Sequence, residues 1–467
     1  MIETRHWVEV AGRQVFYRRF GTGPAVLALH GSPQSSRAIA PAARAIAAQG
    51  LCVIAPDTPG AGGSTPLAGE DLTSADYARA LAGFADALGL GRVGLYGFHT
   101  GAATACVFAA LYPQRTSGLV LEGLPAWTAD ERADFLANYL PRFLPQWDGS
   151  HMTWLWARME EQVLFFPWHR QGAHSRMAYD VTPPEGVHAN CMDLLAAGDA
   201  YRAVYRAAFD FVVSDWIDQV KAPMLIAMAG FDVLAGHLER PGLQGRGGEA
   251  FATLPLLHAR AAEHLSAHCG DRVGALPEAR DRGFLTLTGG ETLAWSGDAG
   301  GQGHLYLHAA GGSGRDRRGG GLALDLPGHG GSAQGWTSVP QTLEGWTDVV
   351  VEACQILGLE DFSVEGDGIG GQIACALRDR GLAREAGARP PRGGHWPSLT
   401  PQWDGAHLVR AFRMARWQQL YAPWDQRTRE NAVVPYGDLD PAAINAHAID
   451  LLLAHERGAA AGVIEGE

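Results

Sequence analysis

The sequence lacks the features that direct a chain into a membrane or across one. No stretch reaches the roughly 18 consecutive apolar residues that a bilayer-spanning helix requires. The first ten residues, MIETRHWVEV, have neither the basic start nor the apolar run of a secretory signal. We therefore expect a cytoplasmic protein without a membrane partner.

Cysteine and positive charge are also sparse. The six cysteines among 467 residues stand singly, without a C-x-x-C pair, and several lie in apolar runs such as LCVIAP. This pattern favours buried free thiols over disulfides or a metal site. The formal net charge is −13 and the basic residues are scattered. Nucleic acid is therefore not an expected partner.

The chain is rich in apolar runs that alternate with alanine-rich segments. Hydrophobic residues form 46% of the chain. Short apolar runs bounded by Gly, Pro or Asp predict strands, and the segments between them have helical periodicity. This alternation predicts an α/β fold with a mostly parallel sheet. The expected strands lie at 25–30, 51–56, 92–97, 117–123 and 223–230.

Several landmarks of the first half return in the second half in the same order. PQWDGSH at 145–151 returns as PQWDGAH at 401–407, a separation of 256 positions. FPW at 166–168 returns as APW at 422–424 with the same separation. The segments 58–64 and 94–106 return at 326–332 and 363–375, which aligns His99 with Gly368. We interpret the chain as a tandem duplication.

The second copy is eroded. The helix that should follow its third strand is missing, because GHLYLHAAGGSGRDRRGGGLALDLPG runs almost directly from one strand to the next. Its sixth strand, expected near 381–398, carries charges and prolines that a central strand would not accept. The last two strands of the pattern have no counterpart. We expect a truncated second domain.

Four segments in the first copy follow an order that resembles the α/β-hydrolase superfamily. They are LALHGSPQSS (27–36), APDTPGAGGST (55–65), the turn G-F-H-T-G after RVGLYG, and the pair MAGFDVL (228–234) with FATLPLLHARAAEHL (251–265). The resemblance covers nearly all of residues 1–270 and, more weakly, 283–467.

The resemblance implies an α/β-hydrolase fold with helices on both faces of the sheet and a helical cap, followed by a second, truncated hydrolase-like domain. The expected core is 1–127 with 219–275, and the expected cap is 128–218. The degenerate second core would be 283–395, and a cap-like helical segment would be 396–467.

The resemblance also assigns site residues. His99 stands at the nucleophile elbow, where the family has serine. Asp232 would orient and charge-stabilise His258 as the acid and base of a catalytic set. The oxyanion loop and pocket would use His30, Gly31, Ser32 and Thr100.

The cap would line an apolar pocket. The candidate lining residues are Trp147, Asp148, His151 and Trp168. Aromatic side chains of this kind suit a pocket lid or a subunit contact. Because these residues recur in the second copy, which has no side chain at its elbow, we favour an architectural role for them over catalysis.

Histidine at the elbow leaves several mechanisms open. His99 could be a nucleophile that forms a short-lived acyl-imidazole. With pKa values near ~6.5, His99 and His258 could instead act as acid and base in hydrolysis or in a lyase or isomerase reaction. A metal held by His30, His99, Asp232 and His258 is a further hypothesis. The fourth is an inactive pseudo-hydrolase that serves binding or assembly.

The preferred hypothesis is an enzyme that acts on a small, largely apolar substrate with a carbonyl group, such as an ester or lactone, without a cofactor or metal. The second copy would expose the edge of an incomplete sheet, which needs a cover. We therefore expect an intramolecular interface between the two copies, and a homodimer.

Overall fold

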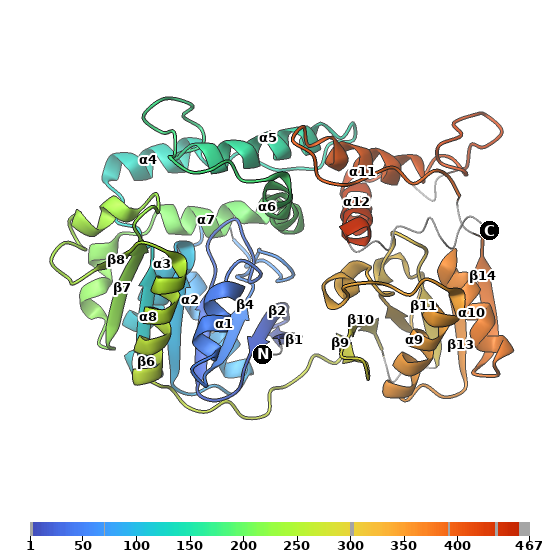
Figure 1. Ribbon diagram of the computed structural model, residues 1–467, viewed down its shortest axis with the longest axis horizontal. Helices are drawn as coiled ribbons and strands as arrows, with labels where there is room; N and C mark the ends of the chain where they lie inside the picture. The colour runs from blue at the N-terminus through green and yellow to red at the C-terminus, as the bar shows by residue number, and fades with distance from the viewer. Residues whose placement is uncertain (1–2, 70, 299–302, 391–392, 435–437, 457–467) are drawn as a thin grey trace. The chain divides into compact units, whose positions relative to one another are not determined.

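The computed structural model describes the chain except residues 1–2, 70, 299–302, 391–392, 435–437 and 457–467 (Figure 1). Contacts within the chain define two compact units. Unit 1 comprises Met1–Phe143, Arg158–Thr182 and Ala189–Glu278. Unit 2 comprises Leu144–Ala157, Pro183–His188 and Ala279–Glu467. The expected cap, residues 128–218, thus contributes segments to both units.

Unit 1 is built on an eight-stranded sheet of order β1-β2-β4-β3-β5-β6-β7-β8. The pairs β1–β2 and β2–β4 are antiparallel, and the other pairs are parallel. In the pairing of β3 with β5, Leu29 lies opposite Gly97, so these two strands end side by side. The strands are β1 (Glu3–Val10), β2 (Arg13–Phe20), β3 (Ala25–Leu29), β4 (Cys52–Pro56), β5 (Val93–Phe98), β6 (Thr116–Glu122), β7 (Met224–Ala229) and β8 (Glu249–Phe251).

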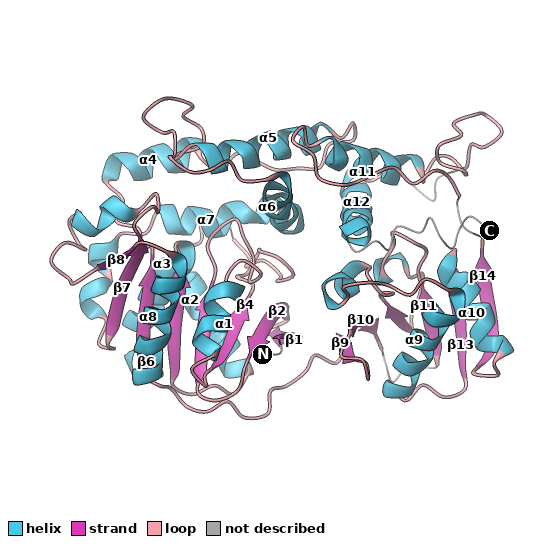
Figure 2. Cartoon of the chain, in the orientation of Figure 1, coloured by secondary structure: helices cyan, strands magenta, loops and turns pink. Residues whose placement is uncertain are grey.

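Helices cover both faces of this sheet (Figure 2). Helices α1 (Ala40–Ala47) and α8 (Leu254–Ala267) pack on one face, and α2 (Ser74–Ala87) and α3 (Thr100–Leu111) pack on the other. The strands β3, β4 and β6 are buried along their whole length. A sheet covered on both faces accepts such continuous apolar runs, which explains why the strands show no polar alternation.

Of the segment expected to form a cap, unit 1 contains α4 (Ala129–Asn138) and α7 (Tyr201–Phe209). Two further helices, α5 (Ser150–Leu164) and α6 (Pro184–Ala197), begin in segments of unit 2 and continue into unit 1. Asp193 on α6 accepts hydrogen bonds from the Ser35 hydroxyl at 2.8 Å and from the Arg37 guanidinium at 2.6 Å. These bonds tie the end of α6 to the loop that follows β3.

Unit 2 contains a six-stranded sheet of order β9-β10-β12-β11-β13-β14. This order matches that of the first six strands of unit 1, taken position by position. As in unit 1, the first two pairs are antiparallel and the other pairs are parallel. The strands are β9 (Arg282–Thr286), β10 (Thr292–Gly297), β11 (His304–Leu307), β12 (Leu322–Leu324), β13 (Phe362–Asp367) and β14 (Ala383–Arg389).

The helices of unit 2 are α9 (Leu343–Ile356), α10 (Ile369–Asp379), α11 (Ala406–Trp417) and α12 (Pro441–Glu456). Between β11 and β12 the described residues form only one short helical turn, Gly314–Asp316. Within the segment 381–398, whose charges and prolines a central strand would not accept, residues 383–389 form β14, which pairs in parallel with β13. It lies at the edge of the sheet, where one side stays exposed and charged side chains remain hydrated.

The turns after β4 and β12 have the same hydrogen bonds. The Ser64 hydroxyl accepts from the backbone N–H of Phe16 at 3.1 Å, and the Ser332 hydroxyl accepts from that of Ala294 at 2.8 Å. The aspartates at the start of each turn also have matching partners. Asp57 accepts from the N–H groups of Ser36 and Gly63, and Asp325 accepts from those of Gly314 and Gly331.

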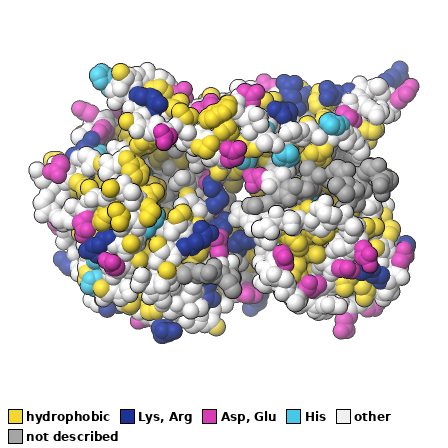
Figure 3. All heavy atoms as spheres, in the orientation of Figure 1, with side chains coloured by type: hydrophobic (Ala, Val, Ile, Leu, Met, Phe, Trp, Pro, Cys, Tyr) yellow, Lys and Arg dark blue, Asp and Glu magenta, His cyan; other side chains and the backbone are white. Residues whose placement is uncertain are grey.

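The surface carries mixed charge. On the face drawn in Figure 3, acidic and basic side chains are interspersed and do not gather into a patch of one sign. No helix within the described ranges is long and apolar enough to cross a membrane.

Candidate active site

The segment G-F-H-T-G forms a sharp turn between β5 and α3. His99 adopts φ 48° and ψ −107°, a backbone conformation that non-glycine residues rarely take. A Cβ atom on Gly97 would lie 2.4 Å from the Gly101 carbonyl oxygen, and one on Gly101 would lie 2.3 Å from the Leu29 carbonyl oxygen. Both flanking glycines are therefore required for this turn, which holds the His99 side chain at the start of α3.

The His99 imidazole is hydrogen-bonded to a carboxylate. Its Nε2 lies 2.8 Å from Oδ2 of Asp232, which follows β7. Burial would raise the pKa of Asp232, but the adjacent His99 ring and the Leu234 N–H outweigh burial and lower the pKa. Asp232 is therefore an ionised acceptor, and we assign the imidazole proton to Nε2. This leaves the Nδ1 lone pair of a neutral His99 available as a base.

The His99 ring is held on two sides. The Phe98 ring stacks on it with a centroid distance of 4.0 Å. Gly123, which follows β6 and has φ 63°, lies against the other side. A Cβ atom at this position would lie 2.2 Å from Cδ2 of His99, so only glycine leaves room for the ring. The orientation of the imidazole is thus fixed by packing as well as by Asp232.

His99 opens onto a pocket with about 360 Å³ of empty space. Ser32 and Thr100 also line it, as the resemblance implied. The Ser32 hydroxyl is buried, and no group among the described residues is its hydrogen-bond partner. The remaining walls are mostly aromatic and aliphatic, formed by Pro125, Trp127, Phe166, Tyr205, Ala208, Phe209, Val233 and Leu234. Such a pocket suits a small, largely apolar molecule with few polar groups.

The structure gives His258 a different partner from the one expected. Helix α8 begins at Leu254, directly after β8 ends at Phe251, so His258 lies within the helix and packs against the sheet. Its ring meets Tyr96 edge-on, and its Nε2 lies 3.8 Å from Oε2 of Glu122. His258 does not line the His99 pocket. The position expected for the base is therefore turned away from the elbow.

Glu122 is a functional candidate that the sequence analysis missed. This last residue of β6 is 3% exposed and accepts a hydrogen bond from the Tyr96 hydroxyl. Burial, with a smaller contribution from the Asp232 charge, raises the pKa of Glu122 from 4.5 to about 8. Burial lowers the pKa of His258. The Glu122–His258 contact is therefore a contact between neutral groups at pH 7. A glutamate that ends an apolar strand was the available signal in the sequence.

His30 and Gly31 have structural surroundings. The His30 ring bonds to the Gly31 carbonyl through Nδ1 at 2.8 Å, and its Nε2 accepts from the Thr58 N–H at 2.9 Å. Because both ring nitrogens bond to backbone, His30 is not free to bind a ligand in the pocket. The four residues of the metal hypothesis do not converge, and the described part of the chain contains no group of three or more candidate ligands. A Cβ atom on Gly31 would lie 3.1 Å from the Phe98 ring, so Gly31 permits close packing.

The four cap residues expected to line the pocket do not line it. Trp147, Asp148 and His151 belong to unit 2. Trp168 belongs to unit 1, where its ring lies 3.9 Å from the guanidinium carbon of the buried Arg158. Aromatic composition indicated a packed cap, but it could not identify which aromatic rings face the pocket.

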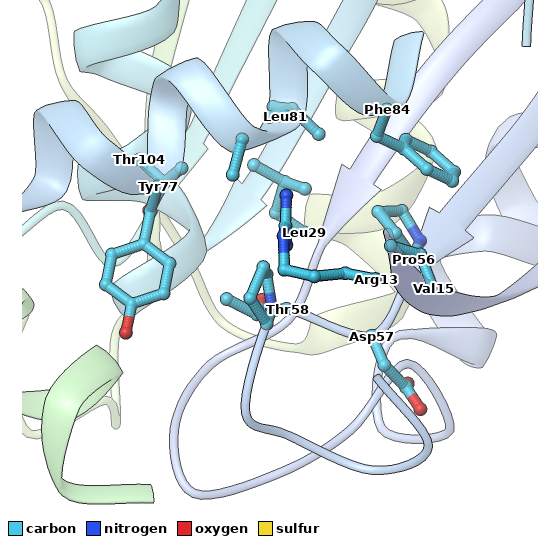
Figure 4. Close-up of a pocket in the computed structure, with 12 residues that line it drawn as sticks. Arg13, Val15, Leu29, Pro56, Asp57, Thr58, Tyr77, Leu81, Phe84 and Thr104 are labelled. Carbon is cyan, nitrogen blue, oxygen red and sulfur yellow. The ribbon is translucent and has the colours of Figure 1, made fainter. Parts of the chain in front are cut away.

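A second pocket of about 370 Å³ lies between the sheet and α2. Figure 4 shows the Arg13 side chain extended across it and the Asp57 carboxylate pointing away. Both Asp57 oxygens accept backbone hydrogen bonds, one from Ser36 in the loop after β3 and one from Gly63 in the turn after β4. Among the residues that the structure describes, no histidine or other base lines this second pocket beside the Asp57 carboxylate. The pairing of an imidazole with a carboxylate occurs at the His99 pocket, which is therefore the better candidate for an active site.

Comparison with known proteins identifies a family model that covers part of the chain. Residues 24–224 match a family model described as alpha/beta hydrolase fold. The first unit has the alpha/beta hydrolase fold. The sheet of this unit is mostly parallel and has helices on both faces, as expected.

Curated relatives match a limited part of the chain. A 2-hydroxy-6-oxononadienedioate/2-hydroxy-6-oxononatrienedioate hydrolase of Burkholderia vietnamiensis is 40% identical over 114 residues, which is 24% of this chain and 40% of the relative. A 2-hydroxy-6-oxo-6-phenylhexa-2,4-dienoate hydrolase of Burkholderia cepacia is 37% identical over 110 residues, 22% of this chain and 37% of the relative. The matches thus span about two fifths of each relative.

Solved structures similar to this chain include an epoxide hydrolase, CorEH, at 18% identity and TM-score 0.43, covering 57% of this chain and 99% of that one. Epoxide hydrolase A from Mycobacterium thermoresistibile has 18% identity and TM-score 0.44, covering 56% of this chain and 98% of that one.

Proposed function

We propose that the first unit is an enzyme that hydrolyses a small, largely apolar substrate at a carbonyl group, with His99 as general base. One observation carries the proposal. The residue at the elbow is an imidazole whose Nε2 is bonded to Asp232 at 2.8 Å, beside a pocket with largely apolar walls. Asp232 selects the tautomer and stabilises the imidazolium that forms when Nδ1 takes a proton.

The reaction uses water as the nucleophile. His99 Nδ1 removes a proton from water, the water oxygen bonds to the carbonyl carbon, and the C=O electron pair moves to oxygen. The backbone N–H groups of Ser32 and Thr100 stabilise this oxyanion, since the first N–H groups of a helix have no intrahelical partner. As the tetrahedral intermediate collapses, the bond to the leaving group breaks and the imidazolium returns its proton to that group.

Water activation is favoured over the other roles considered for His99. A lyase or isomerase reaction that pairs His99 with His258 would need both rings at the pocket, and only His99 lines it. A serine-type triad would likewise need a second imidazole near the elbow. The single His99–Asp232 dyad therefore replaces the separate nucleophile and base of the family pattern.

The named relatives support the substrate class. Both are hydrolases named for 2-hydroxy-6-oxo substrates, which carry a ketone and an unsaturated carbon chain together with one or two carboxylates. The aromatic walls of the His99 pocket suit the ketone-bearing hydrocarbon part of such a molecule. The proposed substrates are accordingly small ketones, esters or lactones.

We also infer that the chain arose by tandem duplication and that the second copy, residues 283–467, is a degenerate hydrolase-like domain. Matching strand order and matching hydrogen bonds of Ser64 and Ser332 support this origin. At the second elbow Gly368 adopts φ 52° and ψ −121°, close to the conformation of His99. This copy has no side chain at its elbow, and its sheet ends at β14.

A second candidate function is ligand binding without turnover. The position of His258 favours it, because this ring lies beside Glu122 and not at the pocket. The site then keeps its pocket but lacks the base that the family pattern places there. Under this alternative, the His99–Asp232 pair would serve only as a polar anchor for the ligand.

Hydrolysis of a panel of acyl esters, lactones and vinylogous diketones tests the proposal. We expect activity in the natural protein, a loss of 100-fold or more in His99→Ala, and a smaller loss in Asp232→Asn. His174→Ala, which removes an exposed cap histidine, serves as the matched control. Equal activity of His99→Ala and the control would refute the role of His99. Substrate binding by calorimetry without turnover in any variant would favour the binding function.

A further inference from the structure

Unit 2 contains a helical bundle built from equivalent parts of the two sequence repeats. The first repeat contributes Leu144–Ala157, which includes the start of α5, and Pro183–His188, which includes the start of α6. The second repeat contributes α11 and α12. These segments, here called the cap bundle, align with one another at separations of 256 and 257 positions.

The first pair of matching contacts places a ring on a glycine. Gly149 and Gly405, one in each P-Q-W-D-G motif, have φ 81° and 63°. A Cβ atom on Gly149 would lie 2.9 Å from the Phe412 ring, and one on Gly405 would lie 2.2 Å from the Trp156 ring. Trp156 and Phe412 are themselves equivalent positions, 256 residues apart. Each repeat thus packs its ring on the glycine of the other.

The second pair of contacts is a buried hydrogen bond. His151 Nε2 lies 3.1 Å from Oδ1 of Asn445, and His407 Nε2 lies 3.0 Å from Nδ1 of His188. His151 and His407 are equivalent positions, and so are His188 and Asn445. All four side chains are buried. The same pair of positions therefore meets twice. In one contact the histidine of the P-Q-W-D-G-x-H motif comes from the first repeat, and in the other it comes from the second repeat.

A contact that occurs twice, with the two partners exchanged, is the mark of a two-fold interface between identical surfaces. We propose that the cap bundle is such an interface, so that the chain is a homodimer of one hydrolase-like module joined into a single polypeptide. This inference rests on the tandem duplication proposed above. If this proposal holds, the second copy packs against the cap segments of the first copy within every chain, in the place that a second subunit would otherwise occupy.

The same inference changes the expected oligomeric state. The surface that would join two chains is already occupied within each chain, because α11 and α12 cover Trp156, His151 and His188. A homodimer formed through the cap is therefore replaced by the pairing inside one chain.

Cutting the folded chain between the repeats tests whether the cap bundle holds them together. Residues 274–280 are largely exposed and contain no helix or strand, so a protease site inserted after Gly274 leaves both sheets intact. After cleavage we expect the two fragments to elute as one species in size-exclusion chromatography. Introducing Trp156→Ala with Phe412→Ala should release them. Separation of the fragments with the natural residues in place would overturn the proposal.

Glycine substitutions test the two-fold relation itself. Gly149→Ala and Gly405→Ala should each lower the Tm by several degrees and by similar amounts, because each adds a Cβ beneath a ring of the other repeat. Gly89→Ala is the matched control, since Gly89 has φ 66° and an open surrounding. Phe412→Ala should partly restore the Gly149→Ala variant, and Trp156→Ala the Gly405→Ala variant.

The outcomes separate this inference from the proposals it rests on. If only one of the two glycine variants loses more than the Gly89→Ala control, the surface is not self-complementary, while the duplication inferred from the two sheets stands. Because none of these substitutions lies in the His99 pocket, activity measurements on His99 remain an independent test of the enzymatic function.

Discussion

Replacing Glu122 by glutamine should stabilise the protein at neutral pH. The Glu122 carboxyl is 3% exposed, accepts from the Tyr96 hydroxyl and has a pKa of about 8 in place of 4.5. Glutamine keeps a carbonyl oxygen for the Tyr96 hydrogen bond but does not ionise in the unfolded chain. At neutral pH the natural Glu122 carboxylate must take up a proton when the chain folds, and this lowers the stability of the folded state. Glutamine removes that cost while conserving the shape of the side chain and its hydrogen bond.

The sign and size of the effect follow from the two pKa values. Because the folded-state pKa is raised, the contribution of Glu122 to stability is full below pH 4.5 and falls as pH rises towards 8. Each pH unit in that interval costs about 1.4 kcal/mol. The stabilisation by Glu122→Gln should therefore be about 1 kcal/mol at pH 5 and about 3 kcal/mol at pH 7, as an upper bound.

Urea unfolding of the natural protein and the variant at pH 5, 6, 7 and 8 measures this difference. Glu263→Gln is the control, because Glu263 is an exposed glutamate on α8, the helix that carries His258. Its free-energy difference from the natural protein should stay near zero at each pH. A difference for Glu122→Gln that does not grow with pH, or a destabilised variant at pH 7, would refute a neutral buried Glu122.

Three further results are expected. Gly123→Ala should displace the His99 ring and reduce kcat/KM at least tenfold, with circular dichroism as the check on folding. Unchanged kinetics would contradict a ring position fixed by packing. Ser64→Ala and Ser332→Ala should each cost about 1 kcal/mol in urea unfolding, and an effect at only one site would argue against equivalent turns. A thiol reagent should modify Cys269 first, since it is the exposed cysteine among six, and mass mapping that finds a buried cysteine first would contradict this.

The fold was largely predictable because its signals are local. Apolar runs bounded by glycine, proline and aspartate located β3 through β7, and the glycines around His99 indicated the turn before α3. The charges of the segment 381–398 argued against a central strand, and β14 lies at the edge of its sheet. Whether a strand lies at an edge depends on the order of the whole sheet, which no single segment encodes.

The candidate site was predictable only in part. Position 99 and the acid at 232 came from motifs with fixed spacing, and the structure brings them together. The structure does not place His258 beside Asp232 or His99, where the resemblance expected the base. Its partner depends on how soon α8 begins after β8, and a difference of a few residues there turns the side chain from the elbow towards Glu122.

The sequence by itself determined the alternating α/β pattern, the recurrence of P-Q-W-D-G at 145 and 401, and the glycine spacing around His99, since each is a matter of periodicity, identity or spacing along the chain. The tertiary structure alone decided that Asp232 bonds to His99, that Glu122 is buried against Tyr96, and that segments of the first cap pack with the second repeat. These outcomes depend on distances between residues far apart in the chain. The pattern of apolar residues along one segment predicts which of its faces is buried. It does not predict which residues of other segments pack against that face.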